Sequence, residues 1–161
     1  MAQSSSSRIL VVDDEEIVVR SLTALLEMET DHTVIGHTSA LAAAELVKTQ
    51  PPDLVISDFL MPDMDGVEFL LEVRRLYPES CLMLLTGYAD KQNAIRAINE
   101  VGIFHYMEKP WDNDDLLEIV ESGLDRRLQL HRLHERVREL EARLRMVEGR
   151  YSELEGRLRE G

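Results

Sequence analysis

The fold is decided by a continuous apolar run that ends in acidic residues, Ile9-Leu10-Val11-Val12-Asp13-Asp14-Glu15. Four consecutive apolar residues with no polar alternation indicate a strand buried on both faces, which is typical of a parallel sheet. Further apolar runs that predict strands lie at 34–35, 54–56, 82–85 and 103–107. Apolar residues at helical spacing fill the intervals at 15–28, 39–49, 66–76 and 90–101, and a fifth helix is expected from Asn113.

Five strand–helix units of this kind predict an α/β fold. We expect a flavodoxin-like, five-stranded parallel sheet in the order 2-1-3-4-5, with helices on both faces. In such sheets the functional site lies at the carboxyl ends of the strands. The residues that follow each strand are therefore the candidates for chemistry.

Charged and hydroxyl side chains follow four of these strands: Asp13-Asp14, Asp58, Thr86-Gly87 and Lys109-Pro110. Three neighbouring carboxylates repel one another and need a counter-charge, which a hard divalent cation such as Mg²⁺ supplies. A carboxylate can also attack phosphorus, and phosphoryl transfer needs mainly positioning and charge neutralisation. The pattern therefore indicates a site for a metal ion and a phosphoryl group.

The sequence resembles the receiver domains of two-component response regulators over residues 8–125. The resemblance rests on four motifs in the right order: Val11-Val12-Asp13-Asp14-Glu15, Asp58-Phe59-Leu60-Met61-Pro62-Asp63-Met64-Asp65-Gly66, Leu85-Thr86-Gly87 and Lys109-Pro110. An Asp pair after a strand can also be a simple helix cap, and Asp63 and Asp65 are better read as turn and cap residues. Together, however, the motifs form a specific signal.

The resemblance implies that Asp58 accepts a phosphoryl group from a histidine kinase or a phosphotransfer protein. It implies that Asp13, Asp14 and Asp58, with the backbone carbonyl of Phe59, hold Mg²⁺, with Mn²⁺ as an alternative ion. Such a protein is a signalling switch, and its own chemistry is limited to gaining and losing the phosphoryl group.

The same resemblance assigns the remaining strand-end residues. Lys109, Thr86 and Gly87 would contact the phosphoryl group, and a cis bond would precede Pro110. Thr86 and Tyr106 would form the switch pair, whose movement reshapes the face made by the fourth helix, the fifth strand and the fifth helix.

Composition supports an intracellular protein rather than a membrane or secreted one. The single Cys81 excludes an internal disulfide, and no apolar run approaches the ~20 residues that span a bilayer. We therefore expect a cytoplasmic protein with a flexible start at 1–7. Residues 1–125 hold 8 basic and 24 acidic side chains, so they repel phosphate backbones, whereas residues 126–161 hold 10 basic and 7 acidic ones.

The segment 126–161 has a heptad pattern that predicts a coiled-coil helix continuous with the fifth receiver helix. Its a and d positions are Leu130, Leu133, Val137, Leu140, Leu144, Val147, Tyr151, Leu154 and Leu158. The g positions carry arginine from Arg136 onward, and the e positions carry glutamate from Glu141 onward. A parallel dimer places opposite charges at every g–e contact, and an antiparallel dimer places like charges together. We therefore expect a parallel homodimer that transmits the switch to an output domain or partner.

Several alternatives remain. The arginines of the tail could form a DNA-binding helix, but the basic run is sparse and is fused to an acidic domain, so we expect no nucleic-acid binding. The chain could be a stand-alone dimeric adaptor, or part of a longer regulator. An aspartyl-phosphate phosphatase would need a second Asp where Leu60 stands. Leu60 and Tyr88 offer no group to orient a hydrolytic water, which predicts slow dephosphorylation. For Trp111, packing against the next helix competes with partner docking, and we expect packing.

Overall fold

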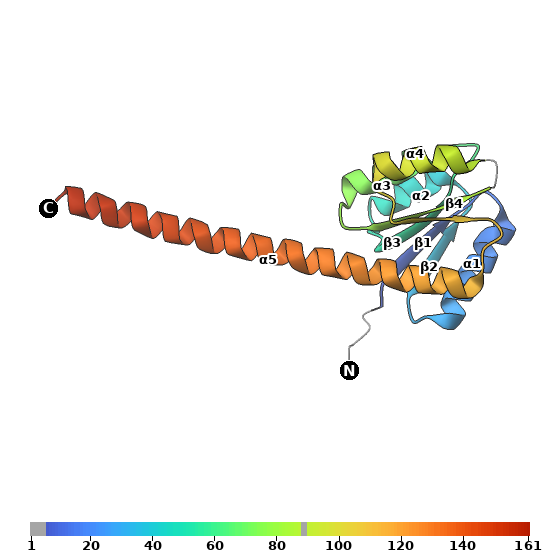
Figure 1. Cartoon of the computed structure of the whole chain (residues 1–161), viewed down its shortest axis with the longest axis horizontal. Helices are drawn as coiled ribbons and strands as arrows, with labels where there is room; N and C mark the ends of the chain where they lie inside the picture. Colours follow the sequence, from blue (N-terminus) through green and yellow to red (C-terminus); the bar gives the residue numbers. More distant parts are fainter. Residues whose placement is uncertain (1–5, 88–89) are drawn as a thin grey trace. The chain divides into compact units, whose positions relative to one another are not determined.

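A computed structural model describes residues 6–87 and 90–161, without the side chains of Lys91 and Arg96. Strands and helices alternate along the chain, and all strands run parallel in the order β2-β1-β3-β4-β5 (Figure 1). The strands are β1 (Arg8–Val12), β2 (Thr33–His37), β3 (Leu54–Asp58), β4 (Cys81–Thr86) and β5 (His105–Glu108). The helices are α1 (Glu16–Glu29), α2 (Ala40–Val47), α3 (Gly66–Leu76), α4 (Lys91–Val101) and α5 (Asn113–Arg159). The predicted architecture and strand order are confirmed.

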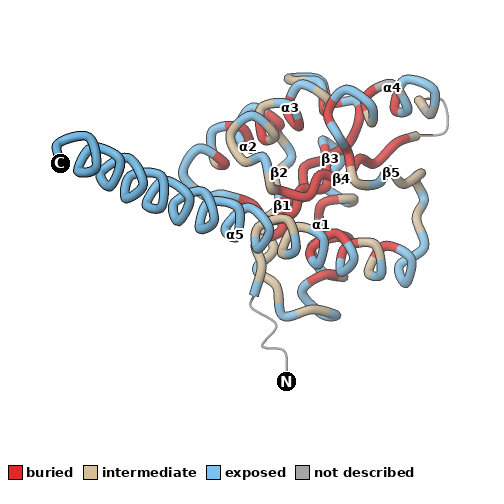
Figure 2. The backbone as a smooth tube through the Cα atoms, turned by 60° about the vertical axis from the view of Figure 1, so that its left-hand side comes forward, coloured by how far each residue is buried: buried red, intermediate tan, exposed pale blue. Residues whose placement is uncertain are grey.

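The sheet carries a hydrophobic core on each face, because successive strand residues point to opposite sides. Leu10 and Val12 of β1 pack with α2, α3 and α4. Ile9 and Val11 pack with α1 and with the first part of α5. The strands are accordingly the most buried part of the chain (Figure 2). Burial on both faces explains why the central strands β1, β3 and β4 are largely apolar, whereas the edge strands β2 and β5 are partly exposed.

The fifth strand differs from the prediction. The apolar run suggested a strand from residue 103, but β5 begins at His105. Ile103 is buried in the core beside α4, and Phe104 packs against the opposite core. The two apolar residues before the strand are therefore core residues of a connecting loop, which an apolar run alone does not distinguish from a strand.

The side chains of Asp65 and Arg74 form hydrogen bonds with backbone groups at the ends of α3 and α4. Asp65 caps α3 by accepting a hydrogen bond from the Val67 amide at 2.7 Å, which confirms the cap reading. Arg74 on α3 donates to backbone carbonyls, including those of Val101 and Gly102 at the end of α4. One guanidinium thereby satisfies carbonyl groups that the end of α4 leaves without a helical partner.

The first part of α5 belongs to the compact unit formed by Met1–Arg127. Leu124 is buried in the core shared with α1, and a Cβ added at Gly123 would lie 2.7 Å from the Cys81 sulfur. Arg127 ends this unit with an ion pair of 2.9 Å to Asp53, whose other oxygen accepts the Arg8 amide. The contacts of α5 with the rest of this unit therefore extend at least to Arg127.

The second unit, Leu128–Gly161, consists of the remainder of α5. Its a and d residues from Leu133 to Leu158 are all exposed in the single chain. Ion pairs within the helix join Arg136 to Glu139 and Arg157 to Glu153. None of the helices in the described part of the chain is both long and apolar enough to cross a membrane.

Candidate functional site

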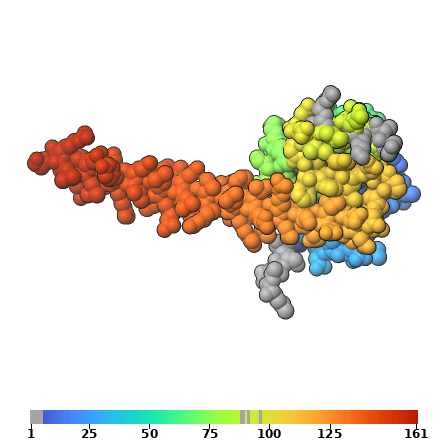
Figure 3. Space-filling model, in the orientation of Figure 1, coloured from blue at the N-terminus to red at the C-terminus, as the bar shows by residue number. Residues whose placement is uncertain are grey.

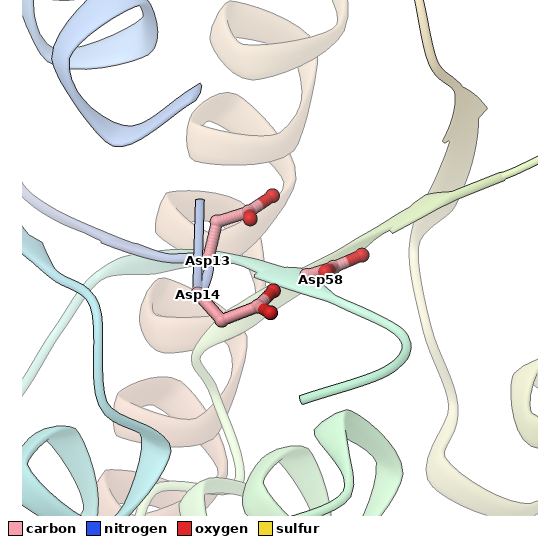
Figure 4. Close-up of side chains that lie close together, drawn as sticks. All are labelled: Asp13, Asp14 and Asp58. Carbon is pink, nitrogen blue, oxygen red and sulfur yellow. The ribbon is translucent and has the colours of Figure 1, made fainter. Parts of the chain in front are cut away.

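Three carboxylates meet at the carboxyl ends of two neighbouring strands. Asp13 and Asp14 directly follow β1, and Asp58 is the last residue of β3. One oxygen from each carboxylate lies within 4.8 Å of the others (Figure 4). Asp13 and Asp58 are buried, whereas Asp14 is exposed. The sequence prediction that these residues lie together is therefore matched by the geometry.

Lys109 supplies the positive charge at this site. Its Nζ atom lies 2.7 Å from Oδ2 of Asp13 and 3.3 Å from Oδ1 of Asp58. It also lies 3.7 Å from the carboxylate of Glu15, which the sequence analysis did not assign to the site. In the sequence, the one indication that Glu15 could belong to the site was its position directly after Asp13-Asp14.

Burial and mutual repulsion change the proton affinities of the site. Burial, followed by the charge of Asp13, raises the pKa of Asp58 to about 7, although Lys109 opposes this shift. Burial likewise raises the pKa of Asp13. Burial disfavours the charged form of Lys109, but its hydrogen bonds and ion pairs with Asp13 and Asp58 raise its pKa overall. One ammonium thus only partly compensates the carboxylates, and the site favours additional positive charge.

The donor set fits a divalent cation. Carboxylate oxygens are the ligands that Mg²⁺ prefers, and it binds proteins through one or two carboxylates while keeping waters and phosphate oxygens in its shell. The exposed Asp14 keeps one side of the group open to solvent. The arrangement is an acidic metal-binding site rather than a closed structural one.

The loop after Asp58 folds back tightly over the strand end. A Cβ at Gly66 would lie 2.0 Å from the Asp58 carbonyl oxygen, so only glycine fits there. The Gly66 amide donates to the carbonyl of Phe59 at 3.1 Å, which leaves that oxygen a second lone pair. Asp63 accepts a hydrogen bond of 2.6 Å from Ser39, and this bond lowers the pKa of Asp63. The loop is thereby tied to the first turn of α2.

The residues predicted to contact a phosphoryl group and to switch lie on β4 and β5. The Thr86 hydroxyl is buried and donates to the Met107 carbonyl at 3.4 Å. Tyr106 pairs with Leu84, two residues before Thr86, so Tyr106 and Thr86 share one face of the sheet. Gly87 follows β4 directly.

The loop after β5 carries the two remaining predicted features. The peptide bond between Lys109 and Pro110 is cis, as predicted. Trp111 packs partly against the core beneath α5, in accordance with the predicted packing role. Tyr88 lies outside the described residues.

Comparison with known proteins settles the family. The model of the response regulator receiver domain matches residues 9–121. The chain belongs to this family. The receiver is followed by a long C-terminal helix, and its acidic pocket is formed by Asp13, Asp14 and Asp58. Receivers typically bind Mg²⁺ and act with a cognate histidine kinase.

Two curated relatives place the receiver within longer regulators. The hydrogenase transcriptional regulatory protein HoxA of Cupriavidus necator is 39% identical over 129 residues, covering 78% of this chain and 26% of that protein. Regulatory protein AtoC of Escherichia coli is 37% identical over 137 residues, covering 83% of this chain and 28% of that protein. The receiver chain therefore spans about a quarter of the length of these relatives.

Solved structures share the fold at similar identity. The signal receiver domain of an HD domain-containing protein from Pseudomonas fluorescens has a TM-score of 0.73 and 34% identity, covering 78% of this chain and 99% of that one. A structure described as adenylate cyclase from Rhodopirellula baltica has a TM-score of 0.76 and 28% identity, covering 83% and 98%. Receivers similar to this one thus occur in proteins with different names.

Proposed function

We propose that this receiver accepts a phosphoryl group on Asp58 from a histidine kinase or a phosphotransfer protein. A carboxylate oxygen of Asp58 forms a bond to phosphorus while the bond from phosphorus to the donor nitrogen breaks, and that nitrogen leaves with the electron pair. The observation that carries the proposal is the position of Lys109, whose ammonium contacts both Asp13 and Asp58. Before transfer this ammonium contacts the carboxylate of Asp58, and after transfer it can contact the negatively charged phosphoryl oxygens.

The neighbouring residues have separate roles in this proposal. Asp13, Asp14 and Asp58, with the Phe59 carbonyl, would hold Mg²⁺, which when bound neutralises charge on the phosphoryl oxygens. The Thr86 hydroxyl donates a long, weak hydrogen bond of 3.4 Å to the Met107 carbonyl. It can break this bond and donate to a phosphoryl oxygen instead. Since Tyr106 lies on the same face of the sheet, a movement of Thr86 opens or closes space for its ring.

Phosphoryl uptake tests the proposal directly. The chain is incubated with Mg²⁺ and acetyl phosphate, and the intact mass is measured. We expect a gain of one phosphoryl group in wild type and in Asp114→Ala, which removes an exposed carboxylate from the first turn of α5. We expect no gain in Asp58→Ala. Equal uptake by Asp58→Ala, or no uptake by wild type, would refute the assignment of Asp58.

We further propose that the tail pairs two chains in parallel. The support is the exposed apolar row from Leu133 to Leu158, together with the opposite charges at g and e. Pairing would bury this apolar row, and packing of such a face supplies most of the stability of helices in proteins. Phosphorylation would then act through α5, which contributes to the receiver core and continues into the tail.

The phosphorylated state should be long-lived. Leu60, two residues after Asp58, is exposed and carries no polar group that could orient a hydrolytic water. We expect the phosphorylated chain to persist for minutes or longer after the donor is removed, measured as loss of the added mass with time. Leu60→Asn should shorten this lifetime severalfold, whereas Leu41→Asn, an exposed leucine on α2, should not change it. A wild-type lifetime of seconds would contradict the prediction.

A further inference from the structure

Glu15 places a fourth carboxylate beside the acceptor site. Its Oε1 atom lies 3.7 Å from Nζ of Lys109. The same ammonium contacts Asp13 at 2.7 Å and Asp58 at 3.3 Å. The backbone amide of Glu15 donates to Oδ1 of Asp13 at 2.9 Å, and this bond holds the backbone of Glu15 next to the site. An ammonium group has three N–H donors, so three carboxylates share the charge of Lys109.

The side chain of Glu15 does not serve the helix that follows it. Glu15 occupies the N-cap position of α1, but its carboxylate accepts no hydrogen bond from the amides of the first turn. Its side chain is 61% exposed, whereas those of Asp13 and Asp58 are 0% and 10% exposed. In Figure 3 the blue part of the chain, which includes α1, reaches the surface of the receiver unit. Glu15 therefore presents its charge on the solvent side of the site.

Glu15 carries the negative charge that the site does not balance. Lys109 and one divalent cation, which the donor set fits, would together balance the three aspartates of the acidic pocket. The distance of 3.7 Å from Glu15 to Lys109 exceeds that of a hydrogen bond, and Asp13 holds the ammonium more closely. The carboxylate of Glu15 thus remains as an excess negative charge where a phosphoryl donor must approach.

We propose that Glu15 makes phosphoryl uptake selective for donors of low negative charge. Every donor brings an anionic phosphoryl group to Asp58, and its repulsion by Glu15 increases with the number of negative charges on the donor. Small, highly charged donors in solution are therefore disfavoured relative to donors with a smaller net charge. This inference rests on the proposed role of Asp58 and adds a specificity-determining residue to that reaction.

Two small donors deliver the same phosphoryl group but differ in charge. Near neutral pH acetyl phosphate is a dianion, whereas phosphoramidate, whose nitrogen is protonated, carries a single net negative charge. With either donor an oxygen of Asp58 forms a bond to phosphorus. In acetyl phosphate the bond from phosphorus to the bridging oxygen breaks, and acetate leaves with the electron pair. In phosphoramidate the bond from phosphorus to nitrogen breaks, and ammonia leaves with the electron pair.

The ratio of the two rates tests the proposal. The initial rate of mass gain of the full chain is measured with each donor at saturating Mg²⁺ and low salt. Glu15→Gln keeps the shape of the side chain and removes its charge. We expect the ratio of the acetyl phosphate rate to the phosphoramidate rate to rise about threefold, the effect of one unit charge acting over a short distance in water. Partial unfolding would slow both reactions alike and leave the ratio unchanged.

The next residue along the chain provides the matched control. Glu16→Gln makes the same change in net charge, but the Glu16 carboxylate is paired with Arg20 at 2.7 Å instead of facing Lys109. Its ratio of rates should equal that of wild type. Glu15→Asp returns a carboxylate to the position and should restore most of the wild-type ratio. Added salt screens exposed charges, so it should bring wild type and Glu15→Gln closer together.

The outcomes separate this inference from the role of Asp58. Uptake by both proteins with the same ratio for wild type and Glu15→Gln would overturn the selectivity and leave Asp58 as the acceptor. An equal rise for Glu15→Gln and Glu16→Gln would show an effect of net charge alone and would overturn the selectivity as well. Absence of uptake by wild type from either donor would refute the acceptor role of Asp58 and, with it, the inference about Glu15.

Discussion

Replacing Asp58 with asparagine is expected to stabilise the metal-free protein at pH 8 by up to about 4 kcal/mol while abolishing phosphoryl uptake. Asparagine keeps the shape of the carboxyl group and removes its charge. In the folded protein that charge is costly, because burial and the neighbouring Asp13 raise the pKa of Asp58 to about 7 from 3.8. The charged carboxylate of Asp58 therefore lowers the free energy of unfolding of the wild-type protein.

The direction of the pH dependence follows from linkage. Between about pH 4 and pH 7 the folded state binds more protons at Asp58 than the unfolded state, so the free energy of unfolding falls as the pH rises. Well above pH 7 the full destabilisation by the Asp58 charge is present, and well below pH 4 there is none. Asp58→Asn lacks this slope, so the variant and wild type should converge in acid and separate towards pH 8.

Urea unfolding in the presence of EDTA at a series of pH values measures this difference. Asp63→Asn is the matched control: the Ser39 hydrogen bond lowers the pKa of Asp63, so its stabilising contribution is present above pH 4 and its removal should destabilise. Added Mg²⁺ should stabilise wild type more than Asp58→Asn. Parallel pH profiles for wild type and Asp58→Asn would show that the Asp58 charge carries no folding cost.

Leu140→Asp is expected to convert the proposed dimer into a monomer. Leu140 is a d residue near the middle of the heptad row and is exposed in the single chain, so aspartate costs the isolated receiver little. In a dimer the change removes two buried leucines, worth ~2 kcal/mol each, and places two carboxylates opposite one another. The dissociation constant should therefore rise about a thousandfold or more.

Sedimentation equilibrium measures this change, and Ala142→Asp is the control. Ala142 is two residues further on at an outward f position, so the same aspartate there should leave the dimer intact. Oxidation of Leu154→Cys tests the orientation, since only a parallel dimer places the two introduced sulfurs side by side, and Cys81 is buried. A wild-type monomer at micromolar concentration, or no cross-link, would contradict the parallel dimer.

The strand-end chemistry could be predicted because parallel strands bring their carboxyl ends to one edge. Asp13, Asp14, Asp58 and Lys109 come together for this reason, and no detail of side-chain packing was required. The apolar runs likewise marked the strands, since burial on both faces favours apolar residues in the central strands β1, β3 and β4. The start of β5 was misplaced because Ile103 is buried without being part of a strand.

Contacts between distant segments left no comparable signal in the sequence. The bond from Ser39 to Asp63 and the four backbone acceptors of Arg74 depend on how the helices pack on the sheet. The pocket beside Trp111 is lined by residues of β5, the loop after it and the start of α5, and its acidic residues look in the sequence like a well-capped helix start. Composition showed an acidic domain but not which surface concentrates the charge.

The ion pair between Arg127 and Asp53 has a consequence for modular exchange of this receiver. A chimera that joins a foreign output segment after residue 121 would discard Leu124 from the core and leave Asp53 without the arginine. A junction placed after Arg127 keeps both contacts and gives the recipient a receiver with an intact interior. The recombination boundary is therefore set by the end of the compact unit at Arg127, and it lies inside a helix rather than in a linker.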